Sequence, residues 1–294
     1  MEVTAIVVVR KGSVRIKSKS LLKLNGQTLI ERKICQLRAT KKIHRVVFGS
    51  DCEQMRAVAK NAGAEVVERD SYFCDESRVS ANEMIGEMMS LVHTDIVVWA
   101  HCTNPLISSH TYDNAVSTFL TYYGQYDSLC SVVELKEHLW CSDKHTPLYM
   151  SRHTPARSLP PLYMQDGGIF IQPYMQMKAN SYFFGRKPYL FEIPKEEFLD
   201  INEIRDYLLA KSIIETSANS LDLESSCSDN HLIPTIPRGG GQFSSQSGVC
   251  SRFREILFVY ISLCKLCKTF MYSSFHKYDD RIMRARYTDT SKVV

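Results

Sequence analysis

The residues best suited to chemistry lie in a basic segment close to the N-terminus. An apolar run at residues 5–9 is followed by residues 10–20, whose cations are Arg10, Lys11, Arg15, Lys17 and Lys19. Gly12 lets the backbone approach an anion closely, and Ser13 offers a hydroxyl. Several flexible cations of this kind can surround a polyphosphate, so the segment indicates a site for a nucleoside triphosphate. A nucleic-acid patch and a basic surface loop without a ligand have the same composition.

The elements that position this loop follow from the hydrophobic pattern. The run at residues 5–9 is typical of a strand buried on both faces, as in a parallel sheet, whose carboxyl edge is where ligands bind. The next expected elements are a helix that starts at a capping box of Thr28 and Glu31, strands at 46–48 and 65–68, and a helix at 53–61. This β–α–β–α–β order predicts a right-handed parallel sheet.

Further strands and a last helix extend the same α/β pattern. The expected strands lie at 95–100, 128–133 and 189–193, and a helix is expected from Glu203 to about Ser212. Another capping box, Ser80 with Glu83, opens a helix. The fold class predicted from residues 1–215 is therefore α/β with a mainly parallel sheet.

The basic segment resembles a known family. Residues 10–20, RKGSVRIKSKS, are similar to R-x-G-S-K-R-I-P-x-K-N, a signature of the CMP-sialic acid synthetases (acylneuraminate cytidylyltransferases) and of relatives that activate Kdo and other nonulosonic acids. The residues that fit are Arg10, Gly12, Ser13, Arg15, Ile16 and Lys19. Val14, Lys17 and Ser20 depart from it, and Lys11 stands at the variable second position, where Gly is preferred.

Later motifs follow in the order of that family. Residues 49–51 and the pair Arg69-Asp70 stand where S-T-D and R-P are found, and residues 101–106 resemble Q-P-T-S-P-L with His101 in place of Gln. Arg157 with residues 159–163 resembles R-x-D-L-P-P-x-Y. The resemblance covers about residues 4–212.

Two further motifs contain changes at polar positions. Residues 165–168 resemble E-N-G-A, with Asp166 in place of Asn. Asp200 and Asn202 stand where D-I-D is found. In an extended segment this spacing places both side chains on one face, although either residue could instead cap the following helix.

The resemblance implies a three-layer, Rossmann-like nucleotidyltransferase fold and assigns roles to particular residues. The catalytic residues would be Lys19, Asp200 and Arg10. CTP would be bound by Arg10, Gly12, Ser13, Arg15, Lys19, Arg69 and Ser80. The sugar would be bound by His101, Thr103, Arg157, Tyr163 and Gln165. Mg²⁺ would be held by Asp200 and Asn202. Ser80 could also be a helix cap alone, and His101 could be purely structural.

Composition limits the other classes of function. The chain has 44% hydrophobic and 23% charged residues, as in ordinary globular proteins, and its net charge of +4 is too small to indicate a nucleic-acid partner. Its 10 cysteines are scattered, and no signal peptide is evident in the N-terminal residues. Reduced thiols and a cytoplasmic location are therefore expected.

The chain divides into unequal parts. Residues 1–215 form the expected cytidylyltransferase domain, within which 134–164 is expected to pack against a second subunit of a homodimer, as the resemblance implies. Residues 216–251, rich in Ser, Gly and Pro, are expected to be a flexible linker. Residues 252–294 are expected to be a basic, apolar helical tail, suited either to weak contact with a membrane surface or to docking on a protein.

The activity implied by the resemblance is transfer of CMP from CTP to the anomeric hydroxyl of an acidic nine-carbon or eight-carbon sugar, with release of pyrophosphate. Sialic acid is the first candidate, and Kdo, legionaminic acid and pseudaminic acid are the alternatives. A second class of hypothesis is a binding or scaffold protein with impaired catalysis. It is motivated by the departures at Val14, Ser20, Asp166 and Asn202.

Overall fold

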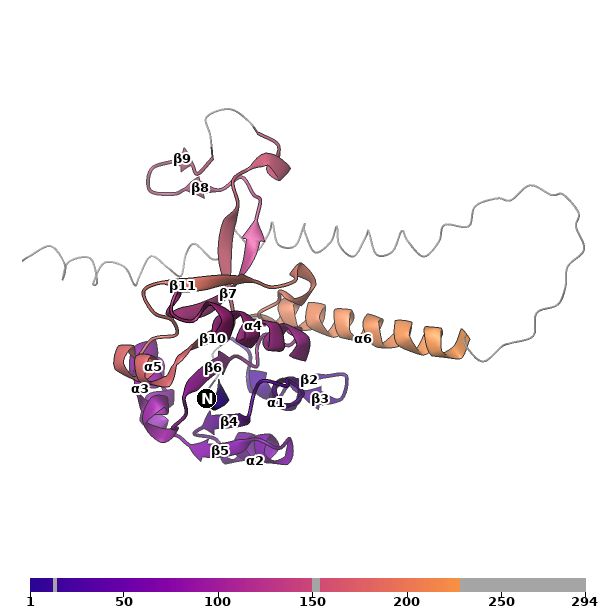
Figure 1. Ribbon diagram of the computed structural model, residues 1–294. Coiled ribbons are helices and arrows are strands. Elements are labelled where there is room, and N and C mark those ends of the chain that lie inside the picture. The colour runs from indigo at the N-terminus through magenta and orange to yellow at the C-terminus, as the bar shows by residue number, and fades with distance from the viewer. Residues whose placement is uncertain (13–14, 150–153, 228–294) are drawn as a thin grey trace, which may run out of the picture. The chain divides into compact units, whose positions relative to one another are not determined.

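A seven-stranded sheet forms the centre of the molecule, as the computed structural model shows for the residues it describes, 1–12, 15–149 and 154–227 (Figure 1). The strand order is β11-β7-β10-β6-β1-β4-β5. The strands are β1 (Val3–Val8), β4 (Arg45–Ser50), β5 (Glu65–Glu68), β6 (Ile96–Ala100), β7 (Ser128–Leu135), β10 (Leu162–Pro173) and β11 (Pro188–Glu192). Within this sheet β10 runs antiparallel to both neighbours, whereas the other pairs are parallel. The mainly parallel sheet predicted from the sequence is confirmed.

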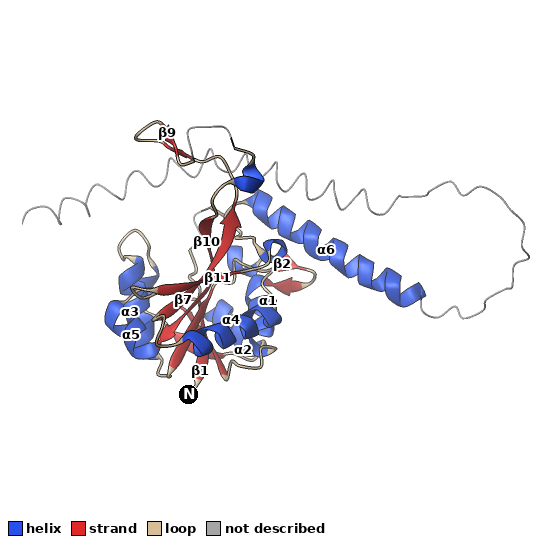
Figure 2. Cartoon of the chain, turned by 45° about the horizontal axis from the view of Figure 1, so that its top comes forward, coloured by secondary structure: helices blue, strands red, loops and turns tan. Residues whose placement is uncertain are grey.

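Helices cover both faces of the sheet, which gives three layers (Figure 2). The helices are α1 (Leu29–Arg38), α2 (Glu53–Asn61), α3 (Ala81–Leu91), α4 (Ser109–Tyr122), α5 (Tyr174–Asn180) and α6 (Ile204–Cys227). Short 3-10 turns lie at η1 (Lys19–Leu21), η2 (Ser71–Cys74), η3 (Ala156–Ser158) and η4 (Lys195–Glu197). Two small antiparallel hairpins lie outside the main sheet. One pairs β2 (Lys23–Leu24) with β3 (Gln27–Thr28), and the other pairs β8 (Trp140–Cys141) with β9 (Thr146–Pro147).

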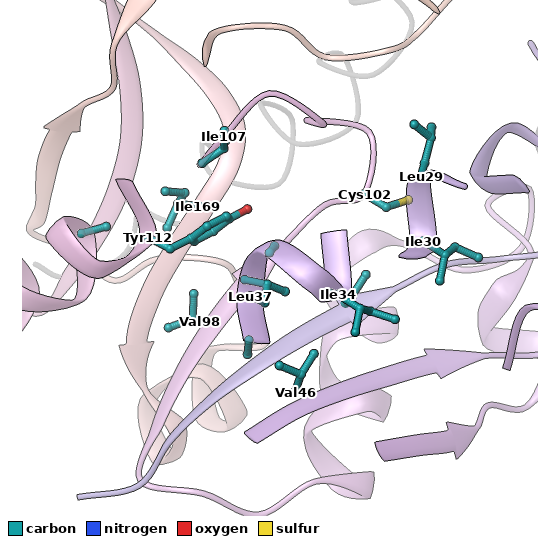
Figure 3. Close-up of a cluster of buried hydrophobic side chains, with 14 of the residues drawn as sticks. Leu29, Ile30, Ile34, Leu37, Val46, Val98, Cys102, Ile107, Tyr112 and Ile169 are labelled. Atoms are coloured by element: carbon teal, nitrogen blue, oxygen red, sulfur yellow. The ribbon is translucent and has the colours of Figure 1, made fainter. Parts of the chain in front are cut away.

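Two apolar cores hold these layers together. The larger core joins α1, α2, α4 and α6 to one face of the sheet, and Figure 3 shows part of it, with Ile34 and Leu37 of α1 near Val46 of β4. The smaller core joins α3 and α5 to the other face. Because successive residues of a strand point to opposite faces, β1 supplies Ala5 to the larger core and Ile6 to the smaller one. This explains why its sequence is apolar without interruption.

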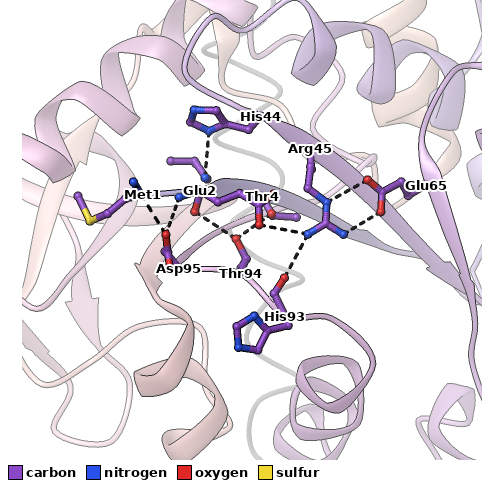
Figure 4. Close-up of polar contacts among 10 residues, drawn as sticks. Met1, Glu2, Thr4, His44, Arg45, Glu65, His93, Thr94 and Asp95 are labelled. Atoms are coloured by element: carbon purple, nitrogen blue, oxygen red, sulfur yellow. Dashed lines mark hydrogen bonds and ion pairs between the residues drawn. The ribbon is translucent and has the colours of Figure 1, made fainter.

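Polar contacts tie the strands together at their amino ends (Figure 4). Arg45 makes a bidentate contact with the Glu65 carboxylate, at 2.9 Å from Nε and 2.8 Å from Nη2. Its Nη1 donates to Glu2 Oε2 at 3.3 Å and to the His93 carbonyl at 3.1 Å. These contacts hold the amino ends of β1, β4 and β5 together with the residues that precede β6.

The last helix is longer than the sequence pattern indicated. It was expected to end near Ser212, but α6 continues to Cys227, so residues 216–227 are helical where a flexible linker was expected. The glycines and prolines that suggested a linker all come after Cys227, which is why the composition of the whole segment was misleading. The rest of the expected linker and the 252–294 tail lie outside the described residues. In the described ranges, none of the helices combines the length and apolarity needed to cross a membrane.

The segment between β7 and β10 extends away from the rest of the sheet, with the β8–β9 hairpin near its tip (Figure 1). It exposes several large apolar side chains, and their exposed fractions are 54% for Trp140, 59% for Leu148, 39% for Leu162 and 47% for Tyr163. It falls within residues 134–164, which were expected to pack against a second subunit and are called the excursion below. The homodimer that the excursion was expected to form stays a prediction.

Candidate active site

A cavity of about 230 Å³ opens at the carboxyl ends of β1 and β6. It is lined by Val8, Val9, Arg10, Arg15, Lys19, Ser20, Glu76, His101, Cys102 and Thr103. The two strands pair in parallel, with Val7 opposite Ala100, so the chain leaves both of them at the same edge. The basic loop after β1 and the turn after β6 were expected to form one site. Both segments line this cavity.

Three of the expected phosphate ligands line this cavity: Arg10, Arg15 and Lys19. Lys19 Nζ donates a hydrogen bond to the Ile201 carbonyl at 2.8 Å. Burial lowers the pKa of Lys19, and the nearby Asp200 carboxylate opposes this effect. Lys19 is thus a partly desolvated cation with a fixed position, which suits an anionic ligand better than a freely moving surface lysine does.

The rest of the basic loop is held by neighbouring motifs. The Lys11 amide donates to Asp51 Oδ1 at 2.9 Å, so the acidic residue that follows β4 anchors the start of the loop. Cys102 Sγ donates to Ser20 Oγ at 3.6 Å, which ties the end of the loop to the turn after β6. Gly12 is exposed, and Ser13 lies outside the described residues.

Arg10 has a partner that the sequence analysis missed. Its Nη2 lies 2.5 Å from Glu76 Oε2, and Glu76 comes from the segment between η2 and α3. The Glu76 side chain is mostly exposed, so it can leave Arg10 at little cost when a stronger anion competes. No sequence pattern marks Glu76, because it stands among other polar residues in an irregular segment.

Asp200 and Asn202 lie next to each other beside this cluster. Asn202 Nδ2 donates to Asp200 Oδ2 at 2.7 Å, and Asp200 Oδ1 is buried without a hydrogen-bond partner among the described residues. The Asp206 carboxylate accepts from the amides of Asn202 and Glu203 at 2.9 and 2.8 Å. Asp206 therefore satisfies two amides just before α6, while the side chains of Asp200 and Asn202 contact each other; that either of them caps this helix stays an alternative.

This pair fits a magnesium ion in part. The buried, unpartnered oxygen of Asp200 is the hard, charged ligand that Mg²⁺ prefers. Asn202 directs its amide hydrogens at Asp200 in this arrangement, so it orients the carboxylate rather than adding a second charge. The described residues contain no group of three or more His, Cys, Asp or Glu side chains that could hold a metal ion, so oxygens of the nucleotide would have to supply further ligands.

His101 lines the cavity, but its ring nitrogens are already used. Nδ1 lies 2.6 Å from the Gly167 carbonyl, and the Trp99 indole donates to Nε2 at 3.2 Å. A carbonyl can only accept and an indole N–H can only donate, so Nδ1 carries the proton and Nε2 does not. Burial also lowers the pKa of His101, which favours this neutral form. His101 therefore has no ring N–H left for a sugar in this arrangement, and the structural alternative, in which it fixes the turn against β10, describes its position better.

Arg69 does not reach the cavity that was expected to hold CTP. It is buried, with Nε 2.8 Å from Glu87 Oε2 and Nη2 donating to the Phe73 carbonyl at 3.2 Å. A Cβ at Gly49 would lie 2.8 Å from its Cδ, so the absence of a side chain at Gly49 makes room for it. Arg69 thus links α3, through Glu87, to the Phe73 carbonyl in the segment that leads to Glu76.

Ser80 also has a local role. Its hydroxyl accepts from the Glu83 amide at 3.3 Å and donates to Glu83 Oε2 at 2.8 Å, which completes the predicted capping box of α3. It is absent from the cavity lining, so the helix-cap interpretation describes its position better than a contact with the nucleotide.

The expected sugar ligands are divided between two places. Thr103 lines the cavity, and its carbonyl accepts from the Ile201 amide at 2.8 Å. Arg157, Tyr163 and Gln165 lie on the η3 turn and on β10, where they are exposed, and they do not line the cavity of this single chain. Their assignment to the sugar stays a prediction.

The sheet order and the cation-lined cavity at its carboxyl edge are typical of α/β proteins that bind nucleotides. The sequence model of one family, described as cytidylyltransferase, matches residues 4–198. The chain therefore belongs to the cytidylyltransferase family.

Similar proteins agree with this class. A 3-deoxy-manno-octulosonate cytidylyltransferase of Chlorobaculum parvum (strain DSM 263 / NCIMB 8327) is 33% identical over 119 residues, which cover 40% of this chain and 46% of that protein. An N-acylneuraminate cytidylyltransferase of Escherichia coli O18:K1:H7 (strain RS218 / NMEC) is 26% identical over 222 residues, covering 72% and 52%. The chain thus spans about half the length of these relatives.

The same fold occurs in a solved structure of a CMP:2-keto-3-deoxy-manno-octonic acid synthetase complexed with CTP, with a TM-score of 0.54. The two sequences are 11% identical, and the match covers 74% of this chain and 100% of that one. The predicted three-layer, Rossmann-like nucleotidyltransferase fold is confirmed.

Proposed function

We propose that this protein transfers CMP from CTP to the anomeric hydroxyl of an acidic sugar and releases pyrophosphate. The observation that carries the proposal is the convergence of Arg10, Arg15 and Lys19 on one cavity beside the unpartnered oxygen of Asp200. Cations and a carboxylate with one unpartnered oxygen, at the carboxyl edge of a mainly parallel sheet, suit a nucleoside triphosphate with its metal. Family membership favours CTP as that nucleotide.

The chain's own residues would bind the phosphates and offset their charge. Arg10 and Arg15 would bind phosphate oxygens as flexible guanidinium groups, and Lys19, held by the Ile201 carbonyl, would offer a fixed ammonium. Fixed charges stabilise the charge that develops as pyrophosphate leaves, because they do not have to reorganise during the reaction. Magnesium, bound through Asp200 and the triphosphate, would neutralise phosphate charge and polarise the reacting phosphorus.

Two acidic sugars are the leading candidates. The names of the relatives specify N-acylneuraminate and 3-deoxy-manno-octulosonate, an acid with nine carbons and one with eight. The longer match to the first relative favours a sialic acid-like sugar, and the higher identity to the second favours Kdo. Legionaminic and pseudaminic acids belong to the same chemical class and should be included in a test.

A homodimer is part of the same proposal. Arg157, Tyr163 and Gln165 are exposed near large apolar side chains of the excursion, and a second subunit on this surface would bury both sets. We propose that these three residues complete a sugar site together with residues of the partner.

The test is pyrophosphate release by the full chain incubated with CTP, magnesium and each acidic sugar in turn. Release with one sugar and not with the others would identify the substrate. CTP binding without pyrophosphate release for every sugar would contradict the transferase proposal and favour the binding or scaffold alternative, for which the departure at Asn202 is the supporting observation.

A further inference from the structure

A buried lysine lies directly behind the cavity wall. Lys33 of α1 is fully buried in the larger apolar core. Its Nζ donates to the Asn104 carbonyl at 2.8 Å and to the Tyr112 hydroxyl at 2.9 Å, and lies 4.9 Å from the centre of the Tyr112 ring. Lysine is almost never fully buried unless it is paired, so this position requires a physical explanation.

The hydrogen bonds of Lys33 belong to a closed ring. Asn104 Nδ2 donates to the Asp166 carbonyl at 3.1 Å, the Gly168 amide donates to Asp166 Oδ2 at 3.1 Å, and the Tyr112 hydroxyl donates to the Gly168 carbonyl at 3.4 Å. The ring joins α1, the turn after β6, β10 and α4. That turn supplies the cavity wall, so a change in the ring would move the wall.

Asp166 is the second charged group of this ring. It is 4% exposed, and its Oδ1 has no hydrogen-bond partner among the described residues. Burial raises the pKa of Asp166, as expected for a carboxylate that loses its hydration. The motif that residues 165–168 resemble has a neutral Asn at this position, so the carboxylate is a feature of this chain that needs a compensating cation.

Lys33 is the cation in this ring, and it is linked to Asp166 through Asn104, Tyr112 and Gly168 rather than by a direct contact with the carboxylate. The pKa of Lys33 is lowered to about 7, chiefly by burial and in small part by Arg32, whereas Cys102, Asp166 and Glu197 favour the ammonium. The ionisable groups that face Lys33 from the neighbouring elements are Cys102, Arg32, Asp166, Glu197, Tyr112 and His101. A lysine in this environment can lose its proton close to neutral pH, and the carboxylate of Asp166 opposes that loss.

We propose that Lys33 is a positioning residue of the cytidylyl-transfer site. Its buried ammonium balances the charge of Asp166 and holds the turn at residues 101–106 against β10. Lys33 is absent from the cavity lining and acts through Asn104, so it shapes the wall that carries His101 and Thr103. The hydrogen-bonded ring that joins Lys33 to Asp166 is a feature of the structure itself, whereas the effect of Lys33 on substrate rests on the proposed function.

The direct test is a pH titration of the full chain labelled with ¹³C at the lysine Cε, followed by NMR. The Lys33 resonance is identified by its loss in Lys33→Met. It should titrate close to neutral pH, and Asp166→Asn should move its midpoint to lower pH, because loss of a nearby negative charge disfavours the ammonium. Lys60→Met, at an exposed position on α2, should remove a different resonance and leave this midpoint unchanged.

An unchanged Lys33 midpoint in Asp166→Asn would overturn the charge pair. If Lys33→Met does not fold, the resonance that shifts in Asp166→Asn still identifies the coupled lysine. A second measurement addresses positioning: Lys33→Met should raise the KM for the sugar several-fold and leave the CTP dissociation constant within about twofold. Equal losses for both ligands would indicate a general structural role and overturn the positioning role.

These measurements separate the inference from the proposed function. A chain that turns over no acidic sugar would contradict the transferase proposal, and the NMR titration would still decide whether Lys33 and Asp166 are paired. The double variant gives a further check: Lys33→Met should cost less thermal stability in the Asp166→Asn background than in the wild type, because no buried carboxylate is then left without a counter-charge. Equal costs in the two backgrounds would contradict the pair.

Discussion

Lys19 is the cation whose position the chain itself fixes, through its hydrogen bond to the Ile201 carbonyl. We predict that CTP with magnesium raises the thermal stability of the full chain and that Lys19→Ala removes most of this shift, because ligand stabilisation falls with affinity. Lys17 belongs to the same loop but is exposed and does not line the cavity, so Lys17→Ala is the matched control. Equal stabilisation of the Lys19→Ala variant would show that the loop does not bind the triphosphate.

Asn202 is the departure closest to the expected metal. Asn202→Asp would place a second carboxylate against Asp200 Oδ2, where the amide now donates at 2.7 Å. We predict that this variant is less stable than the wild type without magnesium, because like charges meet, and that it needs less magnesium for half-maximal activity. Asp200→Ala should abolish turnover. A magnesium titration that is the same for Asn202→Asp and wild type, with Asp200→Ala still active, would contradict a metal role for the pair.

The buried ammonium of Lys33 should also be visible in the pH dependence of stability. Its pKa of about 7 lies below the ordinary value of 10.5, so between these two pH values the unfolded chain holds a proton that the folded chain has released. The free energy of unfolding should therefore gain up to about 1.4 kcal/mol per pH unit from this group as the pH rises through this window. Lys33→Met should lose this contribution in urea titrations at several pH values, and Lys60→Met should keep it. Identical slopes for Lys33→Met and wild type would contradict it.

The sequence pattern predicted helices and strands correctly where they have an uninterrupted apolar run or a capping box. Uninterrupted apolar runs predicted β1 and β6, and the capping boxes of Thr28 and Ser80 predicted the starts of α1 and α3. Local patterns do not reveal contacts between residues that are distant in sequence. The ion pair between Arg10 and Glu76 and the contact of His101 with the Gly167 carbonyl were therefore not predicted. The length of α6 was also missed, because its last residues are polar and lack a helical apolar stripe.

The first half of α6 should matter for folding and its end should not. Ala210 and Ile214 pack in the larger core, whereas the residues after Glu215 that are placed, Thr216 and Ser217, are exposed. A chain ending at Thr216 should therefore fold and keep the CTP affinity of the full chain. A chain ending at Leu209 should lose about 2 to 4 kcal/mol of stability, roughly the burial of the two side chains. Circular dichroism melts test both, and an unfolded chain ending at Thr216 would show that later residues belong to the domain.

At the scale of the whole molecule, the excursion between β7 and β10 should determine the oligomeric state. Leu148 is 59% exposed near its tip, and Leu208 on α6 is equally exposed at 58%. We predict that the full chain is a dimer and that Leu148→Glu weakens it, because a charge would be buried in the interface. Leu208→Glu is the control and should leave the dimer intact. Light scattering gives the mass, and a monomeric wild type at micromolar concentration would contradict the dimer.

Transfer of CMP to an acidic sugar in the cavity can be followed directly. The most direct measurement is ³¹P NMR of a mixture of the full chain, CTP, magnesium and N-acylneuraminate, repeated with 3-deoxy-manno-octulosonate. We predict a new phosphodiester signal and pyrophosphate in equal amounts with one of the two sugars, and neither signal with Lys19→Ala. An unchanged CTP spectrum with every acidic sugar, from a chain that binds CTP, would contradict it.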